Sequence, residues 1–344
     1  MRVISLFDGI SCARVALERA VIPVEAYYAS EVDKYAIQIS KKNYPDIQHI
    51  GGVEDVIIEG KGYRNYCLGF DLLIGGSPCQ DLSIAKRDRK GLDGERSGLF
   101  WEYVRILNEV KPKYFILENV NSMPKEAKEL ITKTLGVEPI MINAALVSAQ
   151  QRKRLFWTNI PNVKLPEDKG IYLKDIIEKG YTERDKSLAL TATYSHGCAK
   201  DYFFKGSRQM IFGKPVRIGQ IGKGGQGDRI YSVEGKSDAL SANGGGRGAK
   251  TGLYIIQKPR GKNKGGIKLS GKVPTLTSSS WEFNNKLFKD GVIRKLSPIE
   301  TERLQGLPDN YTQGISTTQR YKCCGNAFNV DVVAHILSFI LKNE

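Results

Sequence analysis

Short apolar runs alternate with amphipathic stretches over the first 160 residues of the chain. The apolar runs predict buried strands, at residues 3–7, 26–30, 71–74, 114–117 and, less distinctly, 141–147. Residues 12–20 and 34–43 carry the periodicity of amphipathic helices. Strands that alternate with helices in this order indicate a parallel sheet with helices on both faces. We therefore expect an α/β fold with a doubly wound, mostly parallel, Rossmann-like sheet.

Polar or chemically active residues follow several of these predicted strands, at Phe7-Asp8-Gly9, Glu31, Pro78-Cys79 and Glu118-Asn119. Ligands of such folds bind at the carboxyl ends of the strands, so these residues are candidates for one site. Gly9 would let the backbone approach a ligand closely, although a simple tight turn explains it equally well. Glu31 could accept hydrogen bonds from ribose hydroxyls, or it could be a solvated carboxylate. The first loop lacks the glycines of a Gly-x-Gly-x-x-Gly motif, which disfavours a nicotinamide dehydrogenase.

Cys79 is the most distinctive candidate, because an apolar strand ends in two glycines and a rigid proline directly before it. A thiol of ordinary pKa is only slightly ionised at neutral pH, so a nucleophilic cysteine needs a nearby cation or a proton-accepting network. Arg152 and Arg154 are the candidates for that cation, and a structural cysteine is the alternative. None of the six cysteines forms a Cys-x-x-Cys pair and only three histidines exist, so we expect no metal site.

Positive charge is concentrated in residues 187–293, which hold 18 Lys and Arg against 6 Asp and Glu, a net +12 of the chain's +15. This Gly-rich segment is expected to form a separate small domain of strands and loops with a basic surface for a polyanionic partner. A solvated or partly disordered insertion is the alternative. No apolar run is long enough to cross a membrane, and the N-terminus does not resemble a signal peptide, which favours the cytosol. The C-terminal segment predicts a helix with one apolar face, at Val333, Ile336, Leu337 and Ile340.

Taken together, these motifs resemble those of the DNA (cytosine-5) methyltransferases, in particular the bacterial and phage modification methylases, over nearly the whole chain. The ordered series comprises Phe7-Asp8-Gly9, Glu31, Asp55-Val56, Pro78-Cys79-Gln80, Glu118-Asn119-Val120, Gln150-x-Arg152-x-Arg154, the stretch from Arg294 to Pro308, and Gly325-Asn326. The chain departs from the family at Ser11, which stands where the second glycine of the first motif is often found.

The resemblance implies S-adenosylmethionine as methyl donor and S-adenosylhomocysteine as product. It assigns the cofactor to Phe7, Asp8, Gly9, Ile10, Glu31, Val32, Asp55, Val56, Pro78 and Asn326. It further implies that Cys79 adds to carbon 6 of a flipped-out cytosine while Glu118 holds the base and Arg152 and Arg154 orient it. Carbon 5 then takes the methyl group.

The resemblance also implies how the chain is divided. Residues 1–165 and 294–344 would form a discontinuous catalytic domain, 187–293 the target-recognition domain and 166–186 a linker. Contacts to double-stranded DNA are expected from a lid at residues 81–99 and from arginines of the basic segment. The residues proposed for them are Gln80, Ser83, Lys86, Arg87, Arg89, Arg217, Arg229 and Arg247.

Two alternatives stay open at this stage: a tRNA cytosine-5 methyltransferase of the same fold, and a catalytically silent DNA-binding module. The long basic segment favours duplex DNA, and the complete set of Cys79, Glu118, Arg152 and Arg154 favours an enzyme. We expect a monomer in the bacterial cytosol, with no membrane partner. A cognate restriction endonuclease and a phage or prophage origin are further open possibilities.

Overall fold

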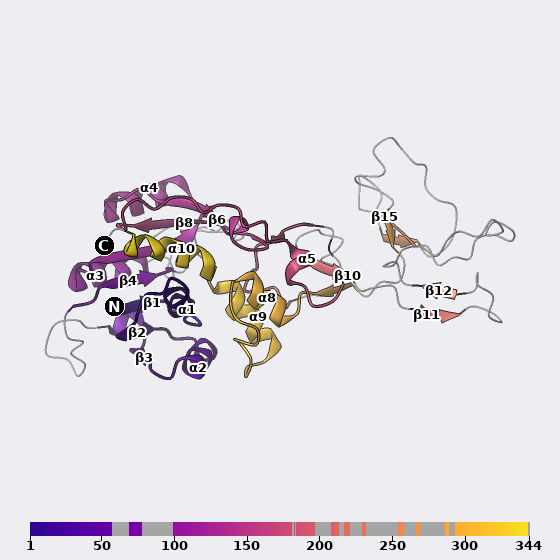
Figure 1. Cartoon of the computed structure of the whole chain (residues 1–344), viewed down its shortest axis with the longest axis horizontal. Coiled ribbons are helices and arrows are strands. Elements are labelled where there is room, and N and C mark those ends of the chain that lie inside the picture. Colours follow the sequence, from indigo (N-terminus) through magenta and orange to yellow (C-terminus); the bar gives the residue numbers. More distant parts are fainter. Residues whose placement is uncertain are drawn as a thin grey trace. The chain divides into compact units, whose positions relative to one another are not determined.

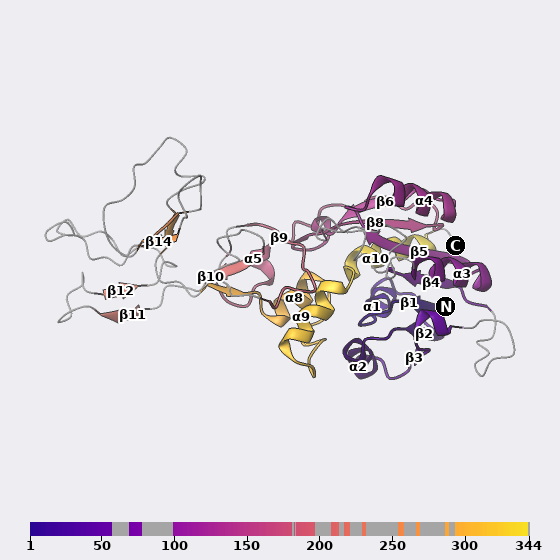
Figure 2. The ribbon, with the colours of Figure 1, turned by 180° about the vertical axis from the view of Figure 1, so that it is seen from behind.

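The structure is a computed structural model, and it describes residues 1–56, 69–77, 99–180, 182, 184–196, 208–212, 217–220, 229–231, 254–257, 266–268, 286–288 and 293–342. The chain divides into two compact units, which are described separately (Figures 1 and 2). The first unit comprises Met1–Tyr172, Lys186–Ser195 and Pro298–Glu344, and the second comprises Leu173–Asp185 and His196–Ser297. The predicted linker, residues 166–186, is thus shared between the two units.

A seven-stranded sheet forms the centre of the first unit, with strand order β3-β2-β1-β4-β5-β8-β6. Its strands are β1 (Arg2–Leu6), β2 (Ala26–Ser30), β3 (Gln48–His49), β4 (Leu72–Gly75), β5 (Tyr114–Val120), β6 (Ile140–Asn143) and β8 (Lys153–Thr158). The five strands from β3 to β5 are parallel neighbours, whereas β8 runs antiparallel to both β5 and β6. The expected mostly parallel α/β sheet is therefore confirmed.

Both faces of the sheet are buried, because successive side chains of a strand point to opposite faces and nearly all of them are apolar. In β4, Leu72 and Ile74 belong to one apolar cluster and Leu73 to the other. The first cluster includes side chains of α1 (Cys12–Arg19), α2 (Lys34–Asn43) and α10 (Val330–Leu341). The second includes side chains of α3 (Leu99–Val110) and α4 (Lys125–Leu135).

The strand order reverses between β1 and β4, since the chain first builds outward through β2 and β3 and then returns to the other side of β1. In doubly wound sheets, ligands bind at such a switch point, beyond the carboxyl ends of the strands. The loop after β1 and the residues after β4 both lie there. This topology therefore brings together several of the residues selected from sequence.

Three helices, α8 (Pro298–Leu304), α9 (Thr317–Asn326) and α10, return the C-terminal segment to the first unit. α10 packs beside α1 (Figures 1 and 2), and its predicted apolar face at Val333, Ile336, Leu337 and Ile340 is buried. By length and composition, Thr317–Leu341 is apolar enough to cross a membrane. Here three non-helical residues separate α9 from α10, and α10 is a core helix.

Shorter elements complete the first unit: the 3-10 turns η1 (Val53–Asp55) and η3 (Ala144–Leu146), and the parallel pair β7 (Gln150–Gln151) and β9 (Ser187–Leu188). The expected strand at 141–147 is shorter than predicted. It ends at Asn143, whose side chain accepts a hydrogen bond from the Ala145 amide and starts the turn η3.

Among its described residues, the second unit has one short helix and several short strands. α5 (Leu173–Ile176) precedes the antiparallel pair β10 (Met210–Phe212) and β16 (Ile293–Lys295). β11 (Arg217–Gln220) pairs with β12 (Arg229–Tyr231), and β13 (Tyr254–Gln257) lies between β14 (Gly266–Lys268) and β15 (Lys286–Phe288). Every pair is antiparallel. A strand-containing basic segment is thus present within the part of the chain that the structure describes.

Candidate active site

The loop that follows β1 has an unusual alternation of backbone conformations. Phe7, Gly9 and Ser11 have φ angles of 56°, 63° and 60°, a region that only glycine enters without strain. A left-handed conformation costs an L-residue roughly 1–2 kcal/mol, so Phe7 and Ser11 both store strain. A Cβ added to Gly9 would meet no atom within 4 Å, so a ligand has room to approach the backbone there. Strained backbone of this kind clusters at ligand sites, where the surroundings hold it in place.

Ser11 replaces the family's glycine, and its hydroxyl explains how the loop tolerates it. The side chain is fully buried, and its Oγ lies 2.5 Å from Oδ2 of Asp8 and 2.6 Å from Oγ of Ser40. Ser40 Oγ in turn lies 3.3 Å from Nε2 of His49. These buried hydrogen bonds stabilise Ser11 in the left-handed conformation, which a glycine would adopt without such partners.

Asp8 is a buried carboxyl group at the centre of this loop. It accepts a hydrogen bond from the Tyr27 hydroxyl at 2.6 Å in addition to that from Ser11. Burial raises the pKa of Asp8 to about 6, and the neighbouring charge of Glu31 acts in the same direction. The hydrogen bonds that Asp8 accepts act in the opposite direction and lower its pKa. Both carboxylate oxygens of Asp8 thus accept hydrogen bonds from protein hydroxyl groups, and the predicted contact of Asp8 to a cofactor stays a prediction.

Glu31, just after β2, binds the same loop from outside. Its Oε2 accepts a hydrogen bond from the Gly9 amide at 2.8 Å, and its Oε1 accepts from the amides of Val32 and Asp33 at 2.7 and 2.8 Å. A carboxylate offers about four acceptor positions, so one is left for a hydroxyl group of a ligand. This is the position expected for an acid that binds a ribose.

The side chains of Val32 and Asp55 both lie close to Gly52. A Cβ on Gly52 would be 3.3 Å from Cγ1 of Val32 and 3.2 Å from Oδ2 of Asp55. The Val32 side chain is 77% exposed and is available to a ligand. Val56, in contrast, is fully buried in the core, and its predicted contact to a cofactor stays a prediction.

The ends of β4 and β5 are joined by side-chain contacts. A Cβ on Gly76 would lie 3.1 Å from Oε2 of Glu118, so the absence of a side chain lets this carboxylate approach the backbone. Asn119 Nδ2 donates a hydrogen bond to Oγ of Ser77 at 3.0 Å, and both side chains are buried. The segment that leads to Pro78-Cys79 is therefore fixed to the Glu-Asn strand end.

Arg154 reaches Glu118 from the neighbouring strand β8. Its Nε lies 2.8 Å from Oε1 of Glu118, with each side chain less than one-fifth exposed. Within the described part of the chain no donor is aligned with Oε1 despite this distance, so the contact is that of an ion pair. The pair places a carboxylate and a guanidinium side by side at the end of the sheet. Such a pair can hold the polar edge of a planar base.

Gln150 and Arg152 bind backbone groups within the first unit. The buried guanidinium of Arg152 donates to the carbonyls of Leu190 at 3.0 Å, Gly325 at 3.3 Å and Ala327 at 2.8 Å. Gln150 accepts a hydrogen bond from the Leu190 amide at 3.1 Å. Arg152 thus connects β7–β8, the segment around Leu190 and the end of α9. The sequence indicated no such role, and the predicted role of Arg152 in orienting the base stays a prediction.

Several residues selected from sequence lie outside the described residues, or are described only as backbone. Those outside are Pro78, Cys79, Gln80, Ser83, Lys86, Arg87, Arg89 and Arg247. Arg217 and Arg229 lie at opposite ends of the β11–β12 ladder, since they pair with Tyr231 and Gln220. Asn326 is exposed as the last residue of α9. The roles predicted for all of these residues stay predictions.

Sequence reasoning missed Tyr311, whose hydroxyl donates a hydrogen bond to the Ile10 carbonyl at 2.7 Å. It also missed Tyr27 and Ser40, which bind Asp8 and Ser11. In a sequence, a tyrosine or serine gives no sign of a hydrogen-bond partner in a distant segment. Ser11, at the second glycine position of the motif, could have provided a signal, because a non-glycine residue there needs partners that stabilise the backbone.

The fold and this site define a Rossmann-like α/β enzyme, with a strained loop after β1, an acidic residue after β2 and a carboxylate–guanidinium pair at the ends of β5 and β8. The family model of the C-5 cytosine-specific DNA methylases matches residues 1–342, and the chain belongs to that family. It is therefore a DNA (cytosine-5) methyltransferase.

Individual relatives agree with this assignment. The chain is 29% identical to the type II methyltransferase M.HhaI of Haemophilus parahaemolyticus, over 98% of this chain and 93% of the relative. It is 26% identical to the orphan methyltransferase M.SPRI of Bacillus phage SPR, over 99% and 97% of the two chains. The fold is shared with the methyltransferase EhMeth of Entamoeba histolytica, with a TM-score of 0.60, 16% identity and coverage of 100% and 98%.

Proposed function

We propose that this methyltransferase transfers a methyl group from S-adenosylmethionine to carbon 5 of a cytosine that is flipped out of a specific duplex DNA sequence, with Cys79 as nucleophile. The observation that carries the proposal is the junction of the β4 and β5 ends, where Gly76 and Ser77 contact Glu118 and Asn119. Cys79 follows Ser77 by two residues, so its thiol is expected within reach of the ring that Glu118 holds.

The residues around the loop after β1 fit S-adenosylmethionine. Open space above Gly9 suits close approach of the methionine part, and the spare acceptor position of Glu31 suits a ribose hydroxyl. Val32 and Asp55, beside Gly52, could hold the adenine ring. The bound donor would supply an electrophilic methyl group on its sulfonium.

The side chains have complementary tasks in the proposed reaction. The Cys79 thiolate adds to ring carbon 6, which places electron density on carbon 5. Glu118 binds the ring nitrogen and the exocyclic amine, and so stabilises the charge that develops. Arg154, paired with Glu118, orients both the carboxylate and the base. Carbon 5 then takes the methyl group, water removes its proton, and the electron pair that returns to the ring expels the cysteine.

Trapping on a 5-fluorocytosine duplex tests the nucleophile, because fluorine cannot be removed as a proton and the covalent adduct persists. We expect a stable DNA–protein adduct for the native chain and none for Cys79→Ser. Cys67→Ser is a matched control from the same part of the sequence and should still form the adduct. Methylation by Cys79→Ala, or an adduct on another cysteine, would contradict the proposal.

The basic second unit is proposed to read the target sequence, with Arg217, Arg229 and Arg247 as candidates for guanine contacts and the segment after Cys79 as the source of phosphate contacts. Replacing several of its lysines by glutamine should weaken DNA binding and flatten its dependence on salt. An unchanged salt slope would refute this assignment. Comparing methyl transfer to duplex DNA and to tRNA tests the substrate class. A monomeric state, a cytosolic location and a paired restriction endonuclease remain predictions.

A further inference from the structure

Each of the four residues 8–11 in the loop after β1 is held by a side chain from elsewhere in the first unit. Tyr27 of β2 binds Asp8, Glu31 binds the amide of Gly9, Tyr311 binds the carbonyl of Ile10, and Ser40 of α2 binds Ser11. The strained φ angles on both sides of these contacts mean that the loop would relax if it were released. The conformation that offers Gly9 to a ligand therefore depends on these contacts.

Tyr311 differs from the other three because it lies 301 positions away in sequence, between α8 and α9. Its side chain is 5% exposed, and its hydroxyl donates to the Ile10 carbonyl at 2.7 Å. Burial raises the pKa of the Tyr311 phenol far above its ordinary value, so the group remains a donor at every physiological pH. A hydrogen bond of this length to a buried carbonyl fixes the orientation of the peptide between Ile10 and Ser11.

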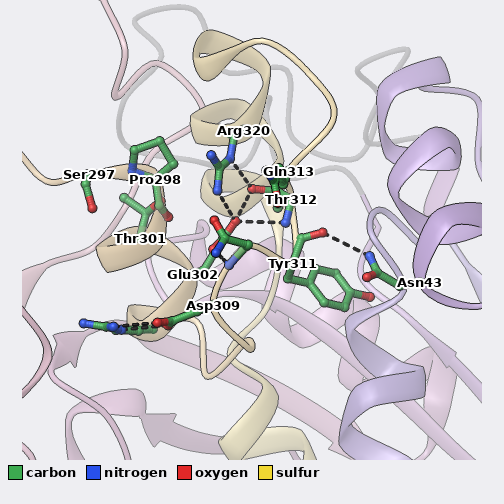
Figure 3. A network of polar contacts seen from close by, with 12 residues as sticks. Asn43, Ser297, Pro298, Thr301, Glu302, Asp309, Tyr311, Thr312, Gln313 and Arg320 are labelled. Atoms are coloured by element: carbon green, nitrogen blue, oxygen red, sulfur yellow. Dashed lines mark hydrogen bonds and ion pairs between the residues drawn. The ribbon is translucent and has the colours of Figure 1, made fainter. Parts of the chain in front are cut away.

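Glu302 holds the backbone of the two residues that flank Tyr311 in sequence, Asn310 and Thr312. This fully buried carboxylate accepts hydrogen bonds from the amides of Asn310 at 2.7 Å and Thr312 at 2.9 Å, and also from the Thr312 hydroxyl. Arg320 of α9 donates to the same carboxylate at 2.8 Å and to the Thr312 hydroxyl at 2.9 Å (Figure 3).

Helix α2 also holds this segment. Asn43 Nδ2 donates to the carbonyl of Tyr311 at 3.0 Å (Figure 3), and Lys42 Nζ donates to the carbonyl of Gln313 at 2.9 Å. Tyr311 is thus anchored at its own backbone before its hydroxyl reaches the loop. A side chain anchored in this way can transmit a fixed position, whereas one on a free loop could not.

We infer that Tyr311 is a positioning residue for methyl-donor binding: it keeps the Ile10 carbonyl, and with it the loop around Gly9, in the conformation that receives the donor. The inference rests on the proposed function of this loop. The affinity for a ligand falls in proportion to the fraction of molecules in the competent conformation. Losing one buried hydrogen bond should lower that fraction roughly three- to tenfold. Steps after donor binding should be unaffected, because among the described residues the Tyr311 hydroxyl binds the backbone of the loop that receives the donor.

Tyr311→Phe tests the inference, since it removes the hydroxyl alone. Calorimetric titration with S-adenosylmethionine and with S-adenosylhomocysteine should show dissociation constants raised roughly three- to tenfold. KM for the donor should rise by the same factor, while kcat and KM for DNA stay at native values. Tyr44→Phe is the matched control: it loses a 2.8 Å hydrogen bond to Glu18 that does not involve the loop, and it should bind the donor like the native chain.

Amide hydrogen exchange of residues 8–11 without donor provides a second measurement that does not depend on the proposed reaction. Faster exchange there in Tyr311→Phe, but not in Tyr44→Phe, is the expected result. Native exchange together with native donor affinity would overturn the inference. An equal loss of affinity in both variants, or a fall in kcat without a change in KM for the donor, would overturn it as well. Failure of the native chain to bind either ligand would refute the proposed function, and exchange would still decide whether Tyr311 holds the loop.

Discussion

Replacing Glu302 by glutamine should cost this fold a large part of its stability. Oε1 of Glu302 accepts from the Thr312 amide and hydroxyl and from Arg320, while Oε2 accepts from the Asn310 amide. A glutamine has only one carbonyl oxygen, so either orientation of its amide directs an NH2 group against a backbone N–H. The Arg320 side chain, 14% exposed, would also lose its countercharge. Breaking a buried ion pair costs about 3–5 kcal/mol, and we expect the free energy of unfolding to fall by about that amount.

Denaturant unfolding followed by tryptophan fluorescence measures this change, because Trp157 is fully buried in the same unit. Glu129→Gln is the matched control, since the Lys125–Glu129 pair is 82% and 63% exposed and should contribute no more than about 0.5 kcal/mol. A Glu302→Gln variant within about 1 kcal/mol of the native chain would refute the reasoning. A double-mutant cycle with Arg320→Gln should reveal a coupling energy of about 0.5–3 kcal/mol.

Three further predictions concern the loop, the nucleophile segment and the C-terminal segment. In Gly325→Ala, the new Cβ would overlap the Thr191 backbone, so we expect a loss of about 3 kcal/mol in unfolding free energy, and a native melting curve would contradict this. Because the folded pKa of Asp8, about 6, exceeds its unfolded value of 3.8, the folded state binds more protons between these pH values. Native stability should therefore fall relative to Asp8→Asn by up to about 3 kcal/mol as pH rises from 4 to 7, and a constant difference would refute it. Gly76→Ala should displace the Glu118 carboxylate and lower kcat about 10- to 100-fold while circular dichroism stays native; unchanged kcat would argue against this geometry.

Hydrophobic periodicity was sufficient to predict four of the five parallel strands, β1, β2, β4 and β5, but not the two-residue β3 at Gln48–His49. The bounds of β2 and α2 agree with the prediction residue by residue, because the charged Glu31 directly follows β2 and the capping side chain of Asp33 directly precedes α2. Alternation could not predict that β8 enters the sheet antiparallel between β5 and β6, since a strand covered on both faces has no distinctive pattern. Residues 150–154 were interpreted as a motif, and because their charged side chains are untypical of a buried strand, the start of β8 at Lys153 was not predicted.

The candidate site was predictable where residue type alone indicates chemistry, as in the acid after β2 and the Glu-Asn strand end. Partners were not predictable, because they depend on contacts between distant segments. Arg152 illustrates this limit: its guanidinium binds backbone carbonyls of Leu190, Gly325 and Ala327, and nothing in a Gln-x-Arg-x-Arg pattern separates this arginine from Arg154, which faces Glu118.

The packing of α10 on α1 delays completion of the apolar core until the end of the chain has been synthesised. Residues 1–172 contain all seven strands of the sheet, yet one apolar layer includes Val330, Val333 and Ile336 from near the end of the chain. At ordinary rates of translation, roughly 8 to 30 s separate the synthesis of residue 172 from that of residue 330. During that interval the apolar side chains that α10 later covers remain exposed, so we expect the nascent chain to bind chaperones that recognise apolar surface. A gene rearranged to encode α10 ahead of β1 would shorten that exposure.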